Sequence, residues 1–370
     1  MRIAFLTDIH IGNPKINLPK LHDVFLGMVF PKLAECELIL FGGDFFDCLL
    51  NINGDAGIFA VSLVDELFEL ISTRDCWLRV LRGTFSHDRY QNRLFTDRPN
   101  GLGNYKGLPK CRTINKVAVE SFPDGPIVAY CPDDLPCKDP TDLVLATLEA
   151  NHLASVDYLC SHGYWDHLLP PAMTIRPHNC LDYNRLGPKI TCHVFNGHVH
   201  SRGIWNKVVT GGSLERFRHG EEEDKGFYLA DWDPATRTDT LTFVKNEKAT
   251  PFITVDMTVL EKGDRALAYL DRRIHETVKN DYTGPIHIRL LGEGSMILPV
   301  IRDRYPNAVV TEKKDPPQRQ AKVEFMGSVS DLPIITEDNL PEIIWNNVKD
   351  EHPNLTIPNI KELLNYATGI

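Results

Sequence analysis

The 370-residue sequence has no Cys-x-x-Cys pair, although it contains nine cysteines. Scattered cysteines, several of them inside apolar runs, argue against a zinc ribbon and are typical of reduced thiols in a cytoplasmic protein. The chain also lacks a run of about eighteen apolar residues, which a membrane-spanning helix needs. We therefore expect a cytoplasmic protein that has no membrane partner.

An excess of positive charge and a recognisable secretion signal are also missing. The sequence has 40 Lys and Arg against 50 Asp and Glu, which gives a formal net charge of −10. A chain with this charge does not present a uniformly positive surface to nucleic acid, although a local basic segment is compatible with it. The start, "MRIAFLTDIHIG", lacks a small-residue cleavage site and is typical of a first strand.

Short apolar runs rich in Val, Ile, Leu and Phe recur along the first two thirds of the chain. They lie at residues 2–7, 37–41, 77–82, 117–122, 126–131, 156–160, 190–195 and 227–232. Between the early runs are longer segments with the helical spacing of apolar residues, at 18–35 and 57–72. Strands that alternate with helices predict an α/β domain.

Aspartate and histidine follow five of these runs where each strand would end, in "LTDIH", "FGGDFFD", "RGTFSHD", "LCSHG" and "FNGHVH". His198 and His200 are one residue apart, so in an extended segment their side chains lie on the same side. In an open α/β sheet the carboxyl ends of the strands share one edge, where sites are built. We therefore expect six side chains to converge there: Asp8, His10, Asp44, His162, His198 and His200.

Six oxygen and imidazole ligands without a thiolate exceed what one tetrahedral zinc ion requires. A mixed set in which one aspartate can bridge suits a pair of hard or borderline cations, such as Mn²⁺, Fe or Mg²⁺. Two such cations in one site are typical of phosphate ester hydrolysis. A lone His-x-His pair is weak evidence, so this hypothesis depends on the whole set.

The order "DIH", "GGDFFD", "SHD", "SHG" and "GHVH" resembles the motifs of the calcineurin-like metallophosphoesterases. Within that superfamily the chain looks like an SbcD-type nuclease, the DNA-cutting subunit of a double-strand-break repair complex. The resemblance implies an α/β fold with a two-sheet sandwich flanked by helices, a small α/β capping domain and a short helical C-terminal segment. The expected boundaries are 1–247, 248–326 and 327–370.

The resemblance also implies an activity and a cofactor. It predicts a DNA exonuclease and endonuclease that hydrolyses phosphodiester bonds in DNA repair and recombination. Two divalent ions would be bound, with Mn expected first and Mg or Fe as alternatives. The ligands of one ion would be Asp8, His10 and His200. The other ion would be held by His162 and His198, with Asp44 as the bridge.

Three further residues receive roles from the resemblance. Asp47 would orient a ligand or a water, as a carboxylate next to a metal site commonly does. His87 would meet the phosphate, stabilising charge or protonating the leaving oxygen. Asp88 would be the carboxylate that orients His87.

One position departs from the family motif. Where the family has an asparagine that ligates the second metal, this sequence reads "RGTFSHD" and has Ser86. A serine hydroxyl is a shorter and weaker ligand, and Thr84 or a water could substitute for it. We therefore expect the second metal to bind more loosely.

Residues 82–116 form a local basic segment in this acidic chain, with eight Lys or Arg against Asp88 and Asp97. Aromatic residues are interleaved with the charges. The segment is either a solvated surface loop or a track for phosphates with aromatic stacking for unpaired bases. Its position directly after His87 favours the track. The candidate DNA contacts are Arg89, Arg93, Arg98 and Lys106.

Other polar residues are expected to be structural. The acidic run at 221–224 predicts a solvated turn, whereas 211–217 resembles the strand and turn that close the site in the nucleases. We expect the remaining histidines to be ordinary packed or surface residues. They include His22, His152, His167, His178, His193 and His219.

The last third of the chain carries no ligand motif. Residues 251–313 predict a small β-α-β-α-β unit that resembles the capping domain, with a plain regulatory domain as the alternative. Residues 336–352 and 356–369 predict two short helices, each with an apolar stripe that needs a partner to bury it. The resemblance implies an SbcC-type coiled-coil ATPase as that partner, and a homodimer is also compatible.

Two other functions stay open. A phosphomonoesterase or nucleotide phosphodiesterase acting on small substrates would use the same metals, although the basic segment and the extra domain argue against it. A scaffold that has lost catalysis is disfavoured because all six expected ligands are present.

Overall fold

The structure is a computed structural model of the chain. It describes residues 1–95, 110–137, 139–169, 177, 179–257, 263–278, 282, 284–292, 296–313, 341, 345, 356–358 and 360. The chain divides into two compact units, Met1–Lys314 and Asp315–Ile370. The predicted C-terminal helices lie largely outside the described residues, as do Arg98 and Lys106.

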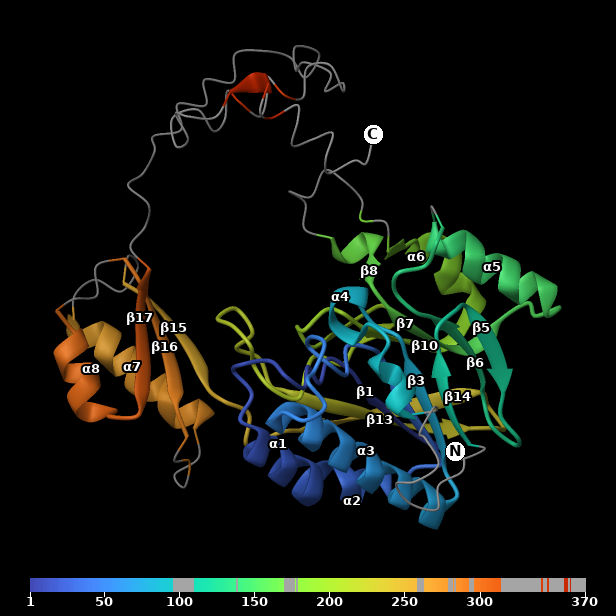
Figure 1. Cartoon of the computed structure of the whole chain (residues 1–370), viewed down its shortest axis with the longest axis horizontal. Coiled ribbons are helices and arrows are strands. Elements are labelled where there is room, and N and C mark those ends of the chain that lie inside the picture. Colours follow the sequence, from blue (N-terminus) through green and yellow to red (C-terminus); the bar gives the residue numbers. More distant parts are fainter. Residues whose placement is uncertain are drawn as a thin grey trace. The chain divides into compact units, whose positions relative to one another are not determined.

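Two six-stranded sheets form the centre of the first unit (Figure 1). The first sheet has the order β14-β13-β1-β2-β3-β4, in which β1 to β4 are parallel and β13 and β14 are antiparallel additions. Its strands are β1 (Arg2–Leu6), β2 (Leu38–Phe41), β3 (Trp77–Leu81), β4 (Cys111–Ile114), β13 (Gly226–Asp233) and β14 (Thr238–Lys245).

The second sheet has the order β11-β12-β10-β7-β6-β5, with a parallel centre and one antiparallel strand at each edge. Its strands are β5 (Ala118–Ser121), β6 (Ile127–Cys131), β7 (Val156–His162), β10 (Ile190–Gly197), β11 (Gly203–Trp205) and β12 (Val208–Thr210). A short parallel pair, β8 (Tyr164–Trp165) and β9 (Cys180–Leu181), follows β7.

The two sheets pack face to face on a shared apolar layer. The rings of Phe5 in β1 and Phe195 in β10 stack with centroids 4.9 Å apart, and Tyr158 in β7 stacks on Phe195 at 5.0 Å. Because side chains alternate along a strand, Phe5 enters this layer while Ala4 and Leu6 point to the opposite face. The strands are therefore buried on both faces.

Helices cover the outer face of each sheet (Figure 1). The first sheet is covered by α1 (Leu18–Val24), a π-helical turn η1 (Phe25–Val29), α2 (Phe30–Leu33) and α3 (Asp55–Arg74). The second is covered by α5 (Pro140–Ala150), α6 (Tyr183–Leu186) and η4 (Gly187–Lys189). This is the predicted arrangement of two sheets flanked by helices.

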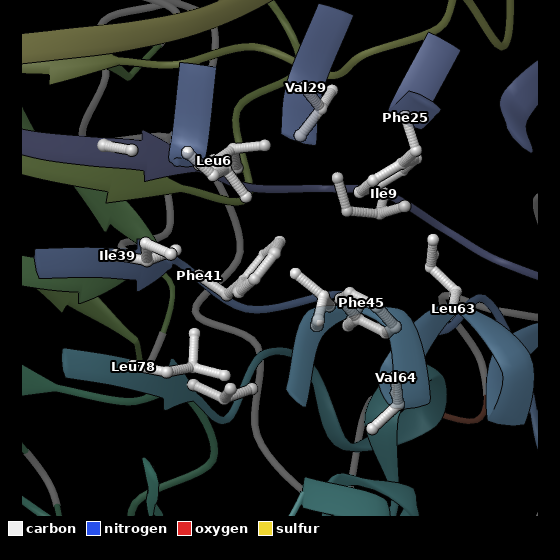
Figure 2. Close-up of a cluster of buried hydrophobic side chains, with 14 of the residues drawn as sticks. Leu6, Ile9, Phe25, Val29, Ile39, Phe41, Phe45, Leu63, Val64 and Leu78 are labelled. Carbon is white, nitrogen blue, oxygen red and sulfur yellow. The ribbon is translucent and has the colours of Figure 1, made fainter. Parts of the chain in front are cut away.

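The core between the first sheet and its helices is dense in large apolar side chains. Figure 2 shows Val29 and Leu63 from the helices beside Leu6, Ile39 and Leu78 from the strands. All of them are 0–1% exposed. Burial of such side chains is worth roughly 1.5–3 kcal/mol each, so this layer fixes where the strand ends lie.

Local sequence explains where several helices begin. The Asn17 side chain accepts a hydrogen bond from the backbone N–H of Lys20 at 3.0 Å and thereby caps α1. Asp139 caps α5 in the same way, accepting from Thr141 at 2.8 Å, and Pro140 occupies the first helical position. Both arrangements satisfy N–H groups that have no partner within the helix.

Residues beyond β14 build a separate three-stranded parallel sheet with its own core. Its elements are β15 (Phe252–Asp256), α7 (Gly263–Thr277), β16 (Ile286–Leu291), α8 (Leu298–Arg304) and β17 (Ala308–Lys313). This order confirms the predicted β-α-β-α-β unit. In β16, Ile288 points into the core with α7 and α8, whereas His287 and Arg289 lie on the other face of the sheet.

Two expectations from composition concern membranes and thiols. Among the described residues, none of the helices combines the length and the apolar character needed to cross a membrane. All nine cysteines are described and all are free. Burial raises the pKa of most of these thiols, for example to about 12 for Cys111, which leaves them protonated and unreactive.

Candidate metal centre

The six candidate ligands come from the ends of strands in both sheets. Asp8 and His10 follow β1, and Asp44 follows β2, in the first sheet. His162 ends β7, and His198 follows β10, in the second sheet; His200 lies two residues further on. The residues therefore meet across the sandwich, and the expectation that they share one edge of a single open sheet was wrong.

Three overlapping groups of side chains are close enough to hold a metal ion, with the ligand atoms of each group within 4.8 Å of one another. One group is Asp8, His10 and His200. Another is Asp44, His162 and His198. The third is His10, Asp44 and His87. Asp44 thus belongs to a group that contains His162 and to a group that contains His10, as a bridging carboxylate requires.

Individual distances support this arrangement. Oδ2 of Asp44 lies 3.3 Å from Nε2 of His162 and 3.9 Å from Nε2 of His10. On the other side, Nε2 of His10 lies 3.0 Å from Nε2 of His200. Two imidazole nitrogens directed at each other at this distance suit a common cation. The resemblance to the metallophosphoesterases implied the same grouping.

The centre is buried. Asp8 is 0% exposed, and His10, Asp44 and His162 are each 2% exposed. The Asp8 carboxylate accepts hydrogen bonds from the Thr7 hydroxyl at 2.8 Å and from the backbone N–H of His198 at 3.1 Å. Buried carboxylates are costly unless they are hydrogen-bonded, paired or bound to a metal, and the chemistry of this donor set fits a divalent metal ion.

The backbone at the centre is held in an uncommon conformation. Positive φ angles occur at Asp8 (53°), His10 (53°), Asp44 (50°) and His198 (79°). For residues other than glycine this conformation costs about 1–3 kcal/mol each and is concentrated at functional sites. Four of the six candidate ligands are therefore kept in place against local strain by the packing around them.

Glycines allow the loops to approach each other. A Cβ at Gly83 would lie 2.2 Å from the backbone N of Asp44, and one at Gly43, where φ is +99°, would lie 2.4 Å from Nδ1 of His162. A side chain at either position would push apart the loops that carry the ligands. Glycine is therefore required at Gly43 in "GGD" and at Gly83 in "RGT" because the loops that carry the ligands contact each other closely there.

The ring nitrogens that face away from the centre have defined partners. Nδ1 of His162 is hydrogen-bonded to the carbonyl oxygen of Gly42 at 2.7 Å, whereas Nδ1 of His10 lies 3.1 Å from Oδ1 of Asp47 as a close polar contact without hydrogen-bond geometry. The amide of Asn13 donates to the same Asp47 oxygen at 3.0 Å. Partners of this kind fix the tautomer and leave Nε2 for a metal. Asp47 thus lies where a carboxylate can orient a ligand.

His200 has an orienting carboxylate that the sequence analysis missed. Nδ1 of His200 lies 3.2 Å from Oε1 of Glu221, which is 2% exposed. Glu221 also accepts from the backbone N–H of Phe217 at 3.2 Å and lies 3.5 Å from Nζ of Lys225, itself 0% exposed. The expectation of a solvated turn at 221–224 was therefore wrong for Glu221.

Charges in the centre stabilise one another. Burial raises the pKa of Asp44, but the adjacent His162 outweighs it, so the carboxyl titrates below its ordinary range. Burial lowers the pKa of His162, but Asp44 outweighs it and raises the pKa above its usual value. Burial likewise raises the pKa of Glu221, but His200 and Lys225 lower it to about 2. The carboxylates are ionised and available to a cation.

The side chain of Thr84, and not that of Ser86, lies close to the group of Asp44, His162 and His198. The Thr84 hydroxyl lies 3.3 Å from Oδ2 of Asp44, 3.4 Å from Nδ1 of His198 and 3.5 Å from Nε2 of His162. Ser86 is exposed on the short helix α4 (Phe85–Asp88). Among the described residues it makes no hydrogen bond to the centre, so the assignment of Ser86 as a ligand is not supported by the geometry.

His87 lies at the edge of the centre, with its ring centroid 4.9 Å from that of His10. Its Nδ1 lies 2.7 Å from the carbonyl oxygen of Asp47. Asp88 was expected to orient His87, but its buried carboxylate accepts from the backbone N–H groups of Gly83 at 2.7 Å and Asp44 at 3.1 Å. Asp88 therefore holds the loops after β2 and β3 together, and the Asp47 carbonyl orients His87.

Two aromatic rings enclose the centre. The Phe217 ring packs against His10 and His200 with centroids 5.0 and 5.3 Å away, as expected for a segment that closes the site. The Tyr164 ring lies 4.4 Å from that of His198. Sequence analysis did not single out Tyr164, although it follows "SHG" directly.

The candidate DNA contacts that the structure describes lie next to His87. Arg89 is exposed, and the Arg93 guanidinium lies 5.5 Å from the centroid of the Tyr90 ring. Tyr90 is 68% exposed and makes an edge contact with Phe85, which is 40% exposed. Exposed aromatic and cationic side chains thus flank His87 in the chain, and Phe85, Tyr90 and Arg93 contact one another in series.

A scan against models of known protein families finds no match to this chain, and a search of curated proteins finds no match either. The function must therefore be inferred from the residues and their geometry.

Proposed function

We propose that this chain is a two-metal phosphodiesterase that hydrolyses DNA as an exonuclease and endonuclease. The observation that carries the proposal is the position of Asp44 between the group of Asp8, His10 and His200 and the group of His162 and His198. Paired cations a few ångströms apart are a recurrent solution for hydrolysis of phosphate esters. The resemblance to the metallophosphoesterases supports the same reaction.

Divalent ions bound by these groups supply Lewis acidity toward a phosphate oxygen and a lowered pKa for an attacking water. The protein orients the ligands through Asp47, Glu221 and the Gly42 carbonyl, which fix their tautomers. Phe217 and Tyr164 exclude water from two sides. Ligands of this mixed carboxylate and imidazole type suit Mn²⁺ first, with Mg²⁺ or Fe as alternatives.

His87 can exchange a proton with the reacting phosphate. A carbonyl oxygen only accepts hydrogen bonds, so the contact with the Asp47 carbonyl places a proton on Nδ1 of His87. Nε2 is then free to deliver or take up a proton at the leaving oxygen. His87 lies beside His10 and Asp44, which puts it at the edge of both groups.

DNA is the proposed substrate because exposed cationic and aromatic side chains flank His87 in the chain. Arg89 and Arg93 can contact phosphates, and Tyr90 and Phe85 can stack on unpaired bases. In this proposal the sheet of residues 252–313 is the capping domain and residues 327–370 bind an SbcC-type coiled-coil ATPase, within a cytoplasmic repair and recombination complex. A homodimer is compatible with it.

The direct test is to incubate the purified full-length protein with linear DNA and with a chromogenic phosphate monoester, in Mn²⁺ and in Mg²⁺. We expect Mn²⁺-dependent DNA cleavage and little release of chromophore. Asp44→Ala should lose both metals and all cleavage, whereas Asp8→Ala should lose one metal. Release of the chromophore without DNA cleavage would point to a small-molecule phosphatase. Full metal content in Asp44→Ala would refute the site.

A further inference from the structure

A cavity of about 520 Å³ is lined by the start of α1 and the loop before it, by the segment after β14, and by β16 and the residues before it. It is separate from the candidate metal ligands. Its lining includes Lys15, Lys20, Lys248, Thr250, Tyr282 and His287. A volume of this size is in the range that accommodates a nucleotide-sized ligand.

The lining is positively charged although the chain as a whole is acidic. Lys20 is neutralised by Glu215, with Nζ 2.7 Å from Oε2. Within the described part of the chain, neither Lys15 nor Lys248 makes an ion pair with a carboxylate. Glu247, the acidic residue of the lining, lies 3.5 Å from Nζ of Lys245. Two unneutralised ammonium groups therefore face one cavity.

The open face of the three-stranded sheet adds the cationic Arg289 and an imidazole, that of His287. His287 and Arg289 are on the same face of β16, and His287 stacks on Phe252 with ring centroids 4.4 Å apart. His219, from the loop before β13, packs on Phe252 at 5.0 Å. Burial and the charges of Arg289, His287 and Lys15 lower the pKa of His219 to about 4. Burial and Lys15 lower the pKa of His287 as well, so both imidazoles are neutral and Arg289 carries the positive charge of this face.

The cavity adjoins the metal centre through Phe217. The Lys15 ammonium donates a hydrogen bond to the Phe217 carbonyl oxygen. The ring of the same residue packs on His10 and His200. Phe217 therefore contacts both the metal centre and a residue that lines the cavity.

We propose that this cavity, the junction cavity, binds a phosphate group of the nucleic-acid strand that is cleaved at the metal centre. The proposal rests on the proposed function, because it names where the substrate backbone is held. Lys15 and Lys248 contact the phosphate, with Arg289 extending the positive surface. The phosphodiester backbone fits because its charges repeat along an extended chain, whereas a single small anion would leave most of the cavity unfilled.

The test uses the full-length protein without metal, in EDTA, so that binding is measured apart from hydrolysis. The variant Lys15→Gln/Lys248→Gln removes two cavity charges, and Lys116→Gln/Arg302→Gln removes two exposed charges elsewhere as the matched control. A short single-stranded oligonucleotide is titrated at several salt concentrations. We expect the cavity variant to bind about tenfold more weakly, with a salt slope reduced by roughly 1.4, since each lost contact removes about 0.7. The control should change less than twofold.

Inorganic phosphate identifies the chemistry of the ligand. It should displace the oligonucleotide from the wild-type protein at millimolar concentration and should displace less from the cavity variant. Equal affinity of the two double variants for the oligonucleotide would overturn the proposal. Binding of thymidine monophosphate to the wild-type protein and not to the cavity variant would not rescue it, because the proposal concerns a nucleic-acid strand. If the wild type fails to cleave DNA while the cavity variant still binds more weakly, the proposed nuclease fails and the phosphate site stands.

Discussion

The carboxylate of Glu221 lies 3.2 Å from Nδ1 of His200, on the side of the ring that faces away from the metal centre. Lys225 and the Phe217 backbone hold that carboxylate in turn. A carboxylate in this position fixes the tautomer of a ligand histidine and raises its basicity. The acidic segment after the last ligand motif is therefore part of the centre.

Glu221→Gln should weaken Mn²⁺ binding by about 10- to 100-fold, the usual effect of removing such a partner. The amide retains the size of the side chain but removes the charge that favours a ligand imidazole. Asp224→Asn is the control, because Asp224 lies in the same segment and pairs with Lys245 near the surface. Isothermal titration with Mn²⁺ measures both. Equal affinities in the two variants would mean that Glu221 only stabilises the loop.

The six candidate ligands could be found in the sequence because each lies at the end of an apolar strand or within a few residues after it. Their meeting across two sheets could not be predicted from strand ends alone, since spacing does not say which sheet a strand joins. Asp8 and His198 touch only because Phe5 and Phe195 stack between the sheets.

Residues that support the ligands were harder to predict. Glu221 lies in a run of acidic residues, and composition cannot distinguish a buried member of such a run from its solvated neighbours. Asp88 accepts hydrogen bonds from Gly83 and Asp44, and the Asp44 contact spans 44 positions of sequence. Its role became visible only once the loops after β2 and β3 were placed together.

Thr84→Val should weaken the binding of the second metal, whereas Ser86→Ala should leave it unchanged. The Thr84 hydroxyl faces Asp44, His162 and His198, and valine keeps its shape while removing the oxygen. Ser86 is exposed on α4. Metal content per chain after dialysis against limiting Mn²⁺ measures the difference. Metal loss in Ser86→Ala with retention in Thr84→Val would restore the assignment made from the motif.

His87→Gln should keep both metals and DNA binding but lower turnover by about 10²- to 10⁴-fold, the range of general acid and base catalysis. Its Nδ1 is committed to the Asp47 carbonyl, so the loss falls on the proton exchanged at Nε2. Single-turnover cleavage in Mn²⁺ separates this step from binding. If Mn²⁺ affinity falls as steeply as turnover, His87 is a metal ligand, which its grouping with His10 and Asp44 would then explain.

Arg89→Gln/Arg93→Gln should weaken binding of single-stranded DNA and reduce the salt slope, because each phosphate contact on a single strand contributes about 0.7 to that slope. Arg93 also packs on Tyr90, so the variant can disturb stacking as well as charge.

Tyr90→Leu separates the two effects, since it removes the exposed ring and keeps both cations. We expect Tyr90→Leu to lower affinity by roughly 1–3 kcal/mol per stacked base with an unchanged salt slope. Fluorescence anisotropy across a salt series measures both quantities in metal-free protein. A slope that is unchanged in the arginine variant would make Arg89 and Arg93 part of a solvated surface, and DNA contact would then depend on the junction cavity.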